Sequence, residues 1–566
     1  MTTLDWLFVL WYFVVALSVG LYYSRRATRS IADFFLSGRA LPWWVVGTSM
    51  VATTFSSDTP LTVSGFVAKN GISQNWIWWA FVLNGTMTAF IFAHLWRRTG
   101  LLTDVEFAEL RYGGKPAAFL RGFRAIYFGV LMNALIIGWV SLAMTKILAV
   151  VAPGWTKGEA LLICMSVVVI YSILAGFWGV VSTDLLQFTM AMVGAVALAI
   201  FAVQGVGGIR MLKAQLLISG KGALLNLFPP TPTIPLMAFV VYLFVQWWAV
   251  WYPGSEPGGG GYIAQRILSS RTERDATLAT LWFNLAHYAV RPWPWILVGL
   301  CIPVVFPGLK DTEMGYPMAM MKFLPVGLRG LMLASFFAAL MSTLDTHFNW
   351  GASYLVNDLY KRFVKPEAPP KHYVKVSQLI TLFLALISAG VAMELRTMKE
   401  AWELIIALGA GTGLVYILRW FWWRVNAWSE ISAMAASFVV ALTLGRLMPG
   451  DGMWPYRVLL TVGITTAIWL SVTFLTSPER REVLVNFYRK VRPGGFWGPV
   501  REEAPEVKPE RMGGRVLLWL LAATLVYCAI FGVGAFILGY AFDGAVLFVI
   551  ALLSAIAIAR LIQRLT

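Results

Sequence analysis

Two stretches of this sequence carry hydroxyl side chains at spacings that could bind a cation. The stretch MVATTFSSDTP, residues 50–60, holds hydroxyl residues, a carboxylate and a proline inside an apolar run. The stretch ASFFAALMSTLDTHFN, residues 334–349, places Ala339, Ser342 and Thr343 at i, i+3 and i+4, on one face of a helix. Hydroxyls and carbonyl oxygens freed by an unwound helix form an uncharged oxygen cage that suits sodium. The alternative is that each hydroxyl bonds back to its own i−4 carbonyl.

Acidic residues form a second group that could do chemistry. Asp58, Asp184, Glu256 and Asp345 fall within or at the edge of apolar runs, where a charge is costly and is usually functional or paired. For Asp345 the alternative is a side chain that reaches cytoplasmic water. For Glu256 the alternative is an ion pair with Arg291.

The elements that must position these residues are membrane helices. The chain has 566 residues, of which 59% are hydrophobic and 13% charged, with a mean hydropathy of +0.71. Apolar runs of about 20 residues recur along it, and each is long enough to cross a hydrocarbon core as a helix. We predict an all-α integral membrane protein with about 15 transmembrane helices. The first run, residues 4–23, is followed by arginines instead of a cleavage site, so we expect it to be retained.

Two of the predicted spans cannot run as continuous helices. Residues 54–60 combine poor helix formers with Pro60, and residues 251–262, WYPGSEPGGGGY, are rich in proline and glycine. Irregular backbone at membrane depth is tolerated only where it is buried or lines a cavity. Interrupted helices at corresponding positions of two inverted repeats mark the binding site of secondary transporters. We therefore predict that spans two to six and seven to eleven form two such repeats.

Charge predicts the orientation and argues against other classes of protein. Basic residues concentrate on alternate connections, which predicts an outer amino terminus and a cytoplasmic carboxyl terminus in the cell (inner) membrane. Anionic lipid on the cytoplasmic face accounts for the net charge of +17, so we expect no nucleic-acid partner. The polar segment 477–514 is expected to be a cytoplasmic linker with an amphipathic, lipid-facing part at residues 483–491. With four histidines and no clustered metal ligands, an enzyme is not expected.

Four stretches together resemble the sodium:solute symporter family, to which the sodium-glucose and sodium-proline transporters belong. They are FFLSGRALPWWVVGTSMVAT (34–53), YSILAGFWGVVSTDLLQ (171–187), GYIAQRILSS (261–270) and LRGLMLASFFAALMSTLDTHFNWGASYLVNDLYKRF (328–363). The resemblance covers about residues 1–480. It implies a LeuT-type 5+5 inverted-repeat core with extra helices at both ends.

The resemblance implies two kinds of cation site. A first sodium is expected between the unwound second span and the ninth, held by the carbonyls of Ala52, Phe55 and Ala339 and the hydroxyls of Ser342 and Thr343. A possible second cation would lie at Asp184, Ser342, Thr343 and Asp345. Asp345 departs from the small or hydroxyl residue usual there, so the number of sodium ions, one or two, and a proton as the second cation both stay open.

The solute is predicted less sharply. The positions that correspond to the family's solute contacts, together with nearby acids, are Thr54, Asp58, Thr59, Trp78, Phe81, Tyr252 and Glu256. Aromatic walls can stack on a sugar, but beside acids they can also hold an organic cation. We expect a monomeric sodium-coupled symporter that imports a small polar solute, with a sugar-like one favoured. The alternatives are a symporter for an organic cation or amino acid, and a symporter-like membrane sensor.

The expected organisation divides the chain into five parts. An extra helix occupies residues 1–35, and the transport core occupies 36–425, with repeats at about 36–205 and 230–425. Additional helices at 426–476, the linker at 477–514 and a helix pair at 515–566 follow.

Overall fold

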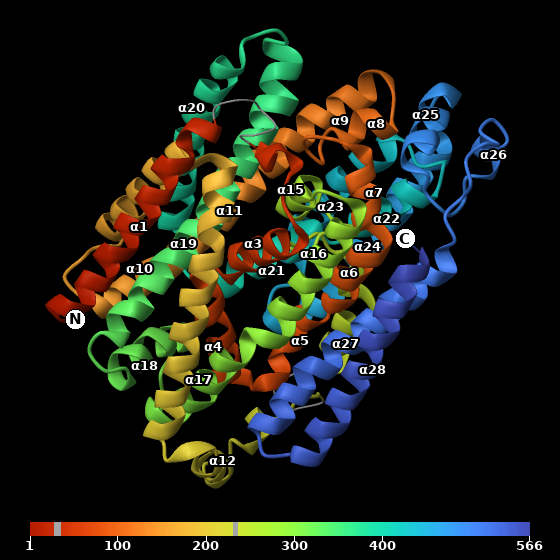
Figure 1. Cartoon of the computed structure of the whole chain (residues 1–566). Helices are drawn as coiled ribbons and strands as arrows, with labels where there is room; N and C mark the ends of the chain where they lie inside the picture. Colours follow the sequence, from red (N-terminus) through yellow and green to blue (C-terminus); the bar gives the residue numbers. More distant parts are fainter. Residues whose placement is uncertain (28–34, 230–235, 566) are drawn as a thin grey trace.

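The computed structural model describes residues 1–27, 35–229 and 236–565. Throughout these residues the regular elements are helices, and the only β-type contacts are three isolated bridges. Figure 1 shows a bundle of long helices with the amino terminus at the left and the carboxyl terminus at the right of the view. The predicted all-α membrane fold is confirmed.

The first part of the chain folds into α1 (Thr3–Ala27), η1 (Ser37–Arg39), α3 (Trp43–Phe55), α4 (Asp58–Asn70) and η2 (Ile72–Asn75). It continues with α5 (Trp76–Trp79), α6 (Val82–Met87), η3 (Thr88–Phe92), α7 (Ala93–Thr99), α8 (Phe107–Arg111), α9 (Gly114–Ile126), η4 (Tyr127–Met132) and α10 (Asn133–Val151). Many of these helices follow one another with few or no residues between them. Several short helices therefore form one interrupted span.

The element α11 (Lys157–Gly205) holds two spans, although it is assigned as one helix. The hydroxyls of Tyr171 and Thr183 lie 3.0 Å apart. Twelve residues of straight helix would separate their Cα atoms by about 18 Å. The chain therefore turns back between these residues, as the prediction of separate fifth and sixth spans requires.

The second part of the chain contains α12 (Gly208–Ile218), η5 (Gly222–Leu225), α13 (Leu236–Val241), η6 (Tyr242–Gln246), α14 (Trp247–Ala249), α15 (Gly261–Ser269), α16 (Glu273–Leu285), η7 (Ala286–Val290) and α17 (Pro292–Val305). It continues with η8 (Thr312–Met314), α18 (Gly315–Phe323), α19 (Leu328–Ser353), η9 (Tyr354–Val364), α20 (Pro370–Glu394), α21 (Met398–Gly409) and α22 (Gly413–Phe421). The expected start of the second repeat, near residue 230, lies outside the described residues.

The chain ends with α23 (Ala427–Leu447), η10 (Asp451–Met453), α24 (Trp454–Leu475), α25 (Arg481–Val491), α26 (Gly498–Arg501), α27 (Met512–Ile537) and α28 (Ala541–Leu565). The last two pack against each other along one side of the bundle (Figure 1). Of the described helices, ten are long and apolar enough to cross a membrane, and Thr3–Val19 and Leu236–Ala249 are shorter apolar helices. The number of about 15 transmembrane helices remains a prediction.

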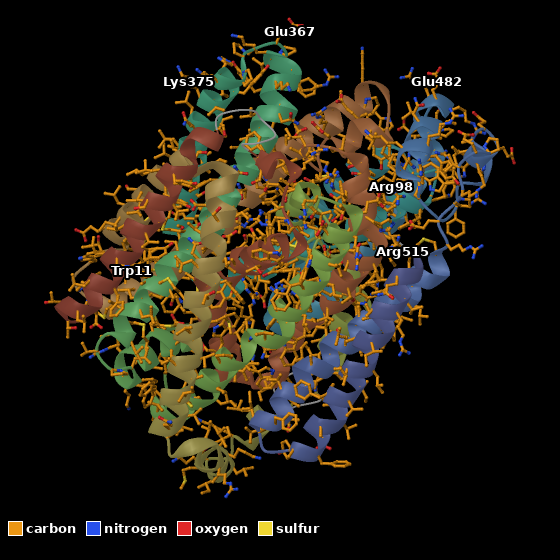
Figure 2. All side chains as sticks on the ribbon, viewed as in Figure 1. Trp11, Arg98, Glu367, Lys375, Glu482 and Arg515 are labelled. Atoms are coloured by element: carbon orange, nitrogen blue, oxygen red, sulfur yellow. The ribbon has the colours of Figure 1, made fainter. Side chains whose placement is uncertain are left out.

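Several charged side chains lie toward the upper end of the bundle in Figure 2. Figure 2 shows Glu367, Lys375 and Glu482 at the upper end, with Arg98 and Arg515 below Glu482. The amino terminus lies at the left of the same view, at the lower end of α1. A bilayer requires long apolar spans, with charged groups placed toward the ends of those spans.

The linker differs from its prediction in one respect. Residues 481–491 do form the amphipathic helix α25, but its apolar face packs on protein instead of lipid. The Phe487 ring is fully buried, 5.7 Å from Phe107 of α8 and 5.5 Å from Trp497. Periodicity alone could not distinguish these two partners, since both are apolar surfaces.

Candidate solute and sodium site

The first interrupted span turns at Ser56 and Ser57. Between the end of α3 and the start of α4, Ser56 adopts φ 50° and ψ 161°, which is costly for a residue with a Cβ atom. Pro60 lies in the first turn of α4, where its missing N–H removes no helical hydrogen bond. The predicted break is present, and the two serines are its turn.

The second interrupted span opens between α14 and α15, and a third interruption stabilises it. The backbone N–H of Trp251 donates to the Gly409 carbonyl at 3.1 Å, and the N–H of Gly411 donates to the Ala249 carbonyl at 3.0 Å. This third interruption, between α21 and α22, was not predicted. The run GAGTG, residues 409–413, is the sequence signal that could have located it.

A hydroxyl of α19 joins that helix to α3 just before the first break. The Thr343 hydroxyl lies 2.8 Å from the Thr53 carbonyl and 3.0 Å from the Ala339 carbonyl one turn back on its own helix. The Thr343 hydroxyl therefore contacts both the i−4 carbonyl of its own helix and a carbonyl of α3. Of the predicted sodium ligands, Ala52 and Phe55 are buried in α3, but the α3 carbonyl that meets Thr343 belongs to Thr53.

Ser342, next to Thr343 on α19, faces the carboxylate of Asp184. Its hydroxyl donates to Asp184 at 2.6 Å, and Ser49 of α3 donates to the other carboxylate oxygen. The guanidinium of Arg266 in α15 lies 4.0 Å from Asp184 and donates to the hydroxyl of Thr53 at 2.8 Å. Arg266 and Ser49 were not predicted, although both belong to stretches that carry the family resemblance.

Asp345 lies on the same helix as this cluster and is fully enclosed. Its carboxylate accepts a hydrogen bond from Ser172 of α11, and its second oxygen has no hydrogen-bond partner in the described part of the chain. The side chain does not reach the aqueous boundary, so that alternative is wrong. A buried carboxylate oxygen without a partner is costly unless a proton or another cation neutralises it.

A cavity of about 70 Å³ lies beside the hydroxyl cluster, at the first two breaks. Thr53 and Thr343 line it, so the cluster and the cavity share residues. The cavity also contains six of the seven predicted solute residues, which are Thr54, Asp58, Thr59, Trp78, Phe81 and Tyr252. Residues far apart in the sequence thus meet around one space.

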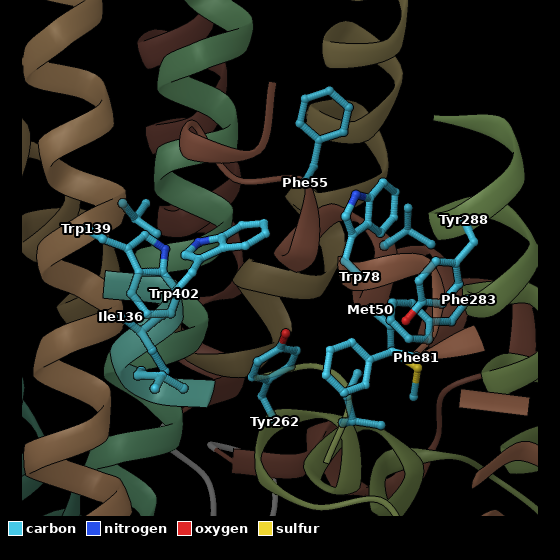
Figure 3. Packing of buried hydrophobic residues seen from close by; sticks show 14 of the residues in the cluster. Met50, Phe55, Trp78, Phe81, Ile136, Trp139, Tyr262, Phe283, Tyr288 and Trp402 are labelled. Carbon is cyan, nitrogen blue, oxygen red and sulfur yellow. The ribbon is translucent and has the colours of Figure 1, made fainter. Parts of the chain in front are cut away.

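Aromatic rings form the walls of this cavity. Figure 3 shows Trp139 and Trp402 on one side, Trp78 and Phe81 on the other, and Tyr262 between them. Trp78 and Phe81 are 6% and 1% exposed, so neither faces lipid. Such faces suit a ring or another flat group of a solute.

The polar side of the cavity contains two residues that the sequence analysis did not assign to it. The imidazole of His287 in η7 lies 2.9 Å from the Thr54 hydroxyl, and a guanidinium nitrogen of Arg291 lies 3.3 Å from the same hydroxyl. Both residues line the cavity. Their spacing of four residues on one helical stretch was the signal that could have grouped them.

Glu256 is placed elsewhere. It lines a second, smaller cavity together with Asp104 and Arg124, and it is absent from the lining of the central one. Within the described residues it forms no ion pair with Arg291, and its carboxylate oxygens have no hydrogen-bond partner. The glycine-rich loop of the second break turns this side chain away from the aromatic cavity, which the sequence could not indicate.

Comparisons with known proteins agree with this geometry. The chain is 26% identical to the sodium/glucose cotransporter 4 of Danio rerio over 541 residues, which cover 84% of this chain and 79% of that protein. It is 24% identical to the sodium/glucose cotransporter of Vibrio parahaemolyticus, with 82% and 89% covered. Its fold is similar to that of a sodium-coupled sialic acid symporter, with a TM-score of 0.68, 20% identity, and 85% and 99% of the two chains covered.

The family model of the sodium:solute symporters matches residues 34–437, which is most of the chain. That range includes the three interrupted spans, the hydroxyl cluster and the aromatic cavity. The chain therefore belongs to the sodium:solute symporter family, whose members are membrane transporters and not enzymes.

Proposed function

We propose that this protein imports a small polar organic solute together with sodium, by alternating access around the central cavity. The observation that carries the proposal is the shared position of Thr53 and Thr343. Both line the cavity, and both belong to the hydroxyl cluster between α3 and α19. A cation held by the cluster and a solute held in the cavity would therefore depend on the same contact between helices.

The residues of the cluster fit sodium. The hydroxyls of Ser342 and Thr343 and the backbone carbonyls of Ala52, Phe55 and Ala339 are hard oxygen donors without full charge. Thr53 offers a further carbonyl 2.8 Å from the Thr343 hydroxyl. Sodium bound there would supply a positive charge that holds the end of α3 to α19. Na⁺ is the coupling ion that the family membership supports.

The residues of this chain can couple the two sites through the first break. Thr343 fixes the last turn of α3, and the turn at Ser56 sets the direction of α4 along the cavity. A ligand shifts a conformational equilibrium only by its difference in affinity for the two states. One charge moved through 100 mV supplies about 2.3 kcal/mol, and a tenfold sodium gradient adds about 1.4 kcal/mol.

A second cation is proposed at Asp184, Ser342, Thr343 and Asp345. The unpartnered oxygen of Asp345 supports a cation or proton there, whereas Arg266 at 4.0 Å from Asp184 already supplies one positive charge. Asp184→Asn should lower the number of sodium ions transported per solute if Asp184 is a ligand. The ratio of sodium to solute fluxes in proteoliposomes measures this number, and a parent ratio of one would exclude a second sodium.

A sugar-like solute is favoured because the relatives include sodium/glucose and sodium/myo-inositol cotransporters and the cavity has aromatic walls. An amino acid or an organic cation is the second candidate, because Asp58 lies in the same cavity. A membrane sensor with a symporter-like fold would bind the solute without transporting it.

We also propose that the functional unit is a monomer and that its core contains two inverted repeats. We place it in the cell (inner) membrane with the amino terminus outside.

The test is uptake of radiolabelled sugars, amino acids and amines into proteoliposomes with and without an inward sodium gradient. We expect uptake of at least one solute that disappears when potassium replaces sodium. Binding without uptake would favour the sensor, and uptake that is indifferent to sodium would refute the coupling.

A further inference from the structure

The central cavity contains a buried guanidinium that no carboxylate of the described residues contacts directly. Arg291 is 1% exposed and lines the cavity. Its guanidinium contacts the Thr54 hydroxyl at 3.3 Å, the Val51 carbonyl at 3.4 Å, and the His287 carbonyl and imidazole at 3.2 and 3.3 Å. These contacts are long for a charged donor, and each acceptor is neutral. Within the described residues, no carboxylate oxygen lies within 4.0 Å of it.

Two other buried arginines of the described residues pair directly with a carboxylate. Arg124 and Arg419 share Glu430 at 2.9 and 3.2 Å. Arg111 donates at 2.8 to 3.2 Å to three backbone carbonyls, one within α22 and two just after it. Unlike Arg124 and Arg419, Arg291 has no carboxylate within 4.0 Å among the described residues, and it lines the central cavity.

Neighbouring rings hold the Arg291 guanidinium in place without neutralising it. It lies 5.3 Å from the ring centre of Trp295 and 5.9 Å from that of Phe55. Cation–π contacts of this kind offset part of the cost of burial. The cost that remains is large for an unpaired charge at membrane depth, where ionisable residues are usually functional.

Asp58 does not account for this charge, although it lines the same cavity. Its carboxylate forms no ion pair with Arg291 among the described residues. It lies in the first turn of α4, where backbone N–H groups and the helix dipole favour a negative charge. Asp58 therefore attracts the guanidinium across the cavity without contacting it, and the carboxylate of a ligand in the cavity can approach Arg291 more closely.

We propose that the transported solute carries a carboxylate that binds Arg291, with the Thr54 hydroxyl and the His287 ring beside it. Guanidinium and carboxylate match in geometry and pair through two parallel hydrogen bonds. The body of the solute lies between Trp78 and Trp402, which suits a ring or another flat group. This inference rests on the proposed symport function and restricts its substrate class to carboxylated solutes, such as sugar acids or amino acids.

The experiment uses pairs of compounds that differ only in the carboxylate. The purified full-length protein is heated in saturating sodium with glucuronate or glucose, and with phenylalanine or phenylalaninamide. We expect the carboxylated member of at least one pair to raise the unfolding temperature, and its partner without the carboxylate to have no effect. Arg291→Gln should weaken that binding at least about tenfold, whereas Arg291→Lys, which keeps the charge, should retain part of it.

Stabilisation by sodium alone is the control that each variant is folded. It also distinguishes a failure of this inference from a failure of the proposed symport function. Equal binding of the partners without the carboxylate would overturn the inference. So would unchanged affinity in Arg291→Gln, or binding by neither member of either pair while sodium still stabilises the parent. Loss of the sodium effect in the parent would instead count against the proposed function.

Discussion

At the scale of single residues, one hydroxyl connects the proposed sodium site to the first break. Thr343→Val removes the hydroxyl that lies 2.8 Å from the Thr53 carbonyl and keeps the shape of the side chain. We expect the sodium concentration for half-maximal thermal stabilisation to rise about tenfold, since one oxygen ligand is lost. Ser342→Ala should act in the same direction because its hydroxyl bonds Asp184.

The matched control for Thr343→Val is Ser353→Ala on the same helix. Among the described residues, the Ser353 hydroxyl bonds only the Trp350 carbonyl of its own helix, at 2.7 Å. Its removal should leave the sodium dependence unchanged. Equal sodium dependence of Thr343→Val and the parent would remove Thr343 from the site.

At the scale of elements, the interruption between α21 and α22 supports the second break. A Cβ atom at Gly413 would lie 2.1 Å from the Trp248 carbonyl, so Gly413→Ala must push the two interrupted spans apart. We expect a loss of about 1–3 kcal/mol of stability and weaker solute binding. Thermal unfolding and a binding titration measure the two effects.

The control for Gly413→Ala is Gly463→Ala in α24, where a new Cβ atom would meet nothing within 4 Å. This change should be neutral or slightly stabilising because alanine favours helix. Similar destabilisation by both variants would show that the cost is not specific to the contact between breaks.

At the scale of the whole molecule, the linker is attached to the ends of the core helices. Glu510 accepts a hydrogen bond from the His94 ring at 2.7 Å and pairs with Arg515 at 2.7 Å. Burial raises the pKa of Glu510, but the hydrogen bond and charge of His94 and the charge of Arg515 outweigh it and lower the pKa to about 2. The folded pKa thus lies below the ordinary value of 4.5.

The attachment of the linker should therefore depend on pH. The contribution of Glu510 is fully present above about pH 4.5 and is lost as the pH falls toward 2, because the unfolded carboxylate binds a proton first. Glu510→Gln should abolish this dependence and speed trypsin cleavage after Arg511 by about fivefold or more at neutral pH. Glu502→Gln, at an exposed position, should cleave at the parent rate.

The membrane class, the two breaks and the shared face of Ser342 and Thr343 were determined by the sequence alone. Each follows from local properties, which are the length of apolar runs, the poor helix formers near Pro60 and the 3.6-residue period. The family resemblance likewise depends on contiguous motifs, so it needed no tertiary structure. Six of the seven predicted solute residues line one cavity because four of them flank those breaks.

Only the tertiary structure decided which distant side chains share the site. Thr54 meets His287 across 233 positions of sequence, and Arg291 reaches the same hydroxyl across 237. It also placed Glu256 in a separate cavity, and the apolar face of α25 on protein. Such pairings depend on how helices pack against one another, and packing depends on the shapes of all their faces together, which no local pattern encodes.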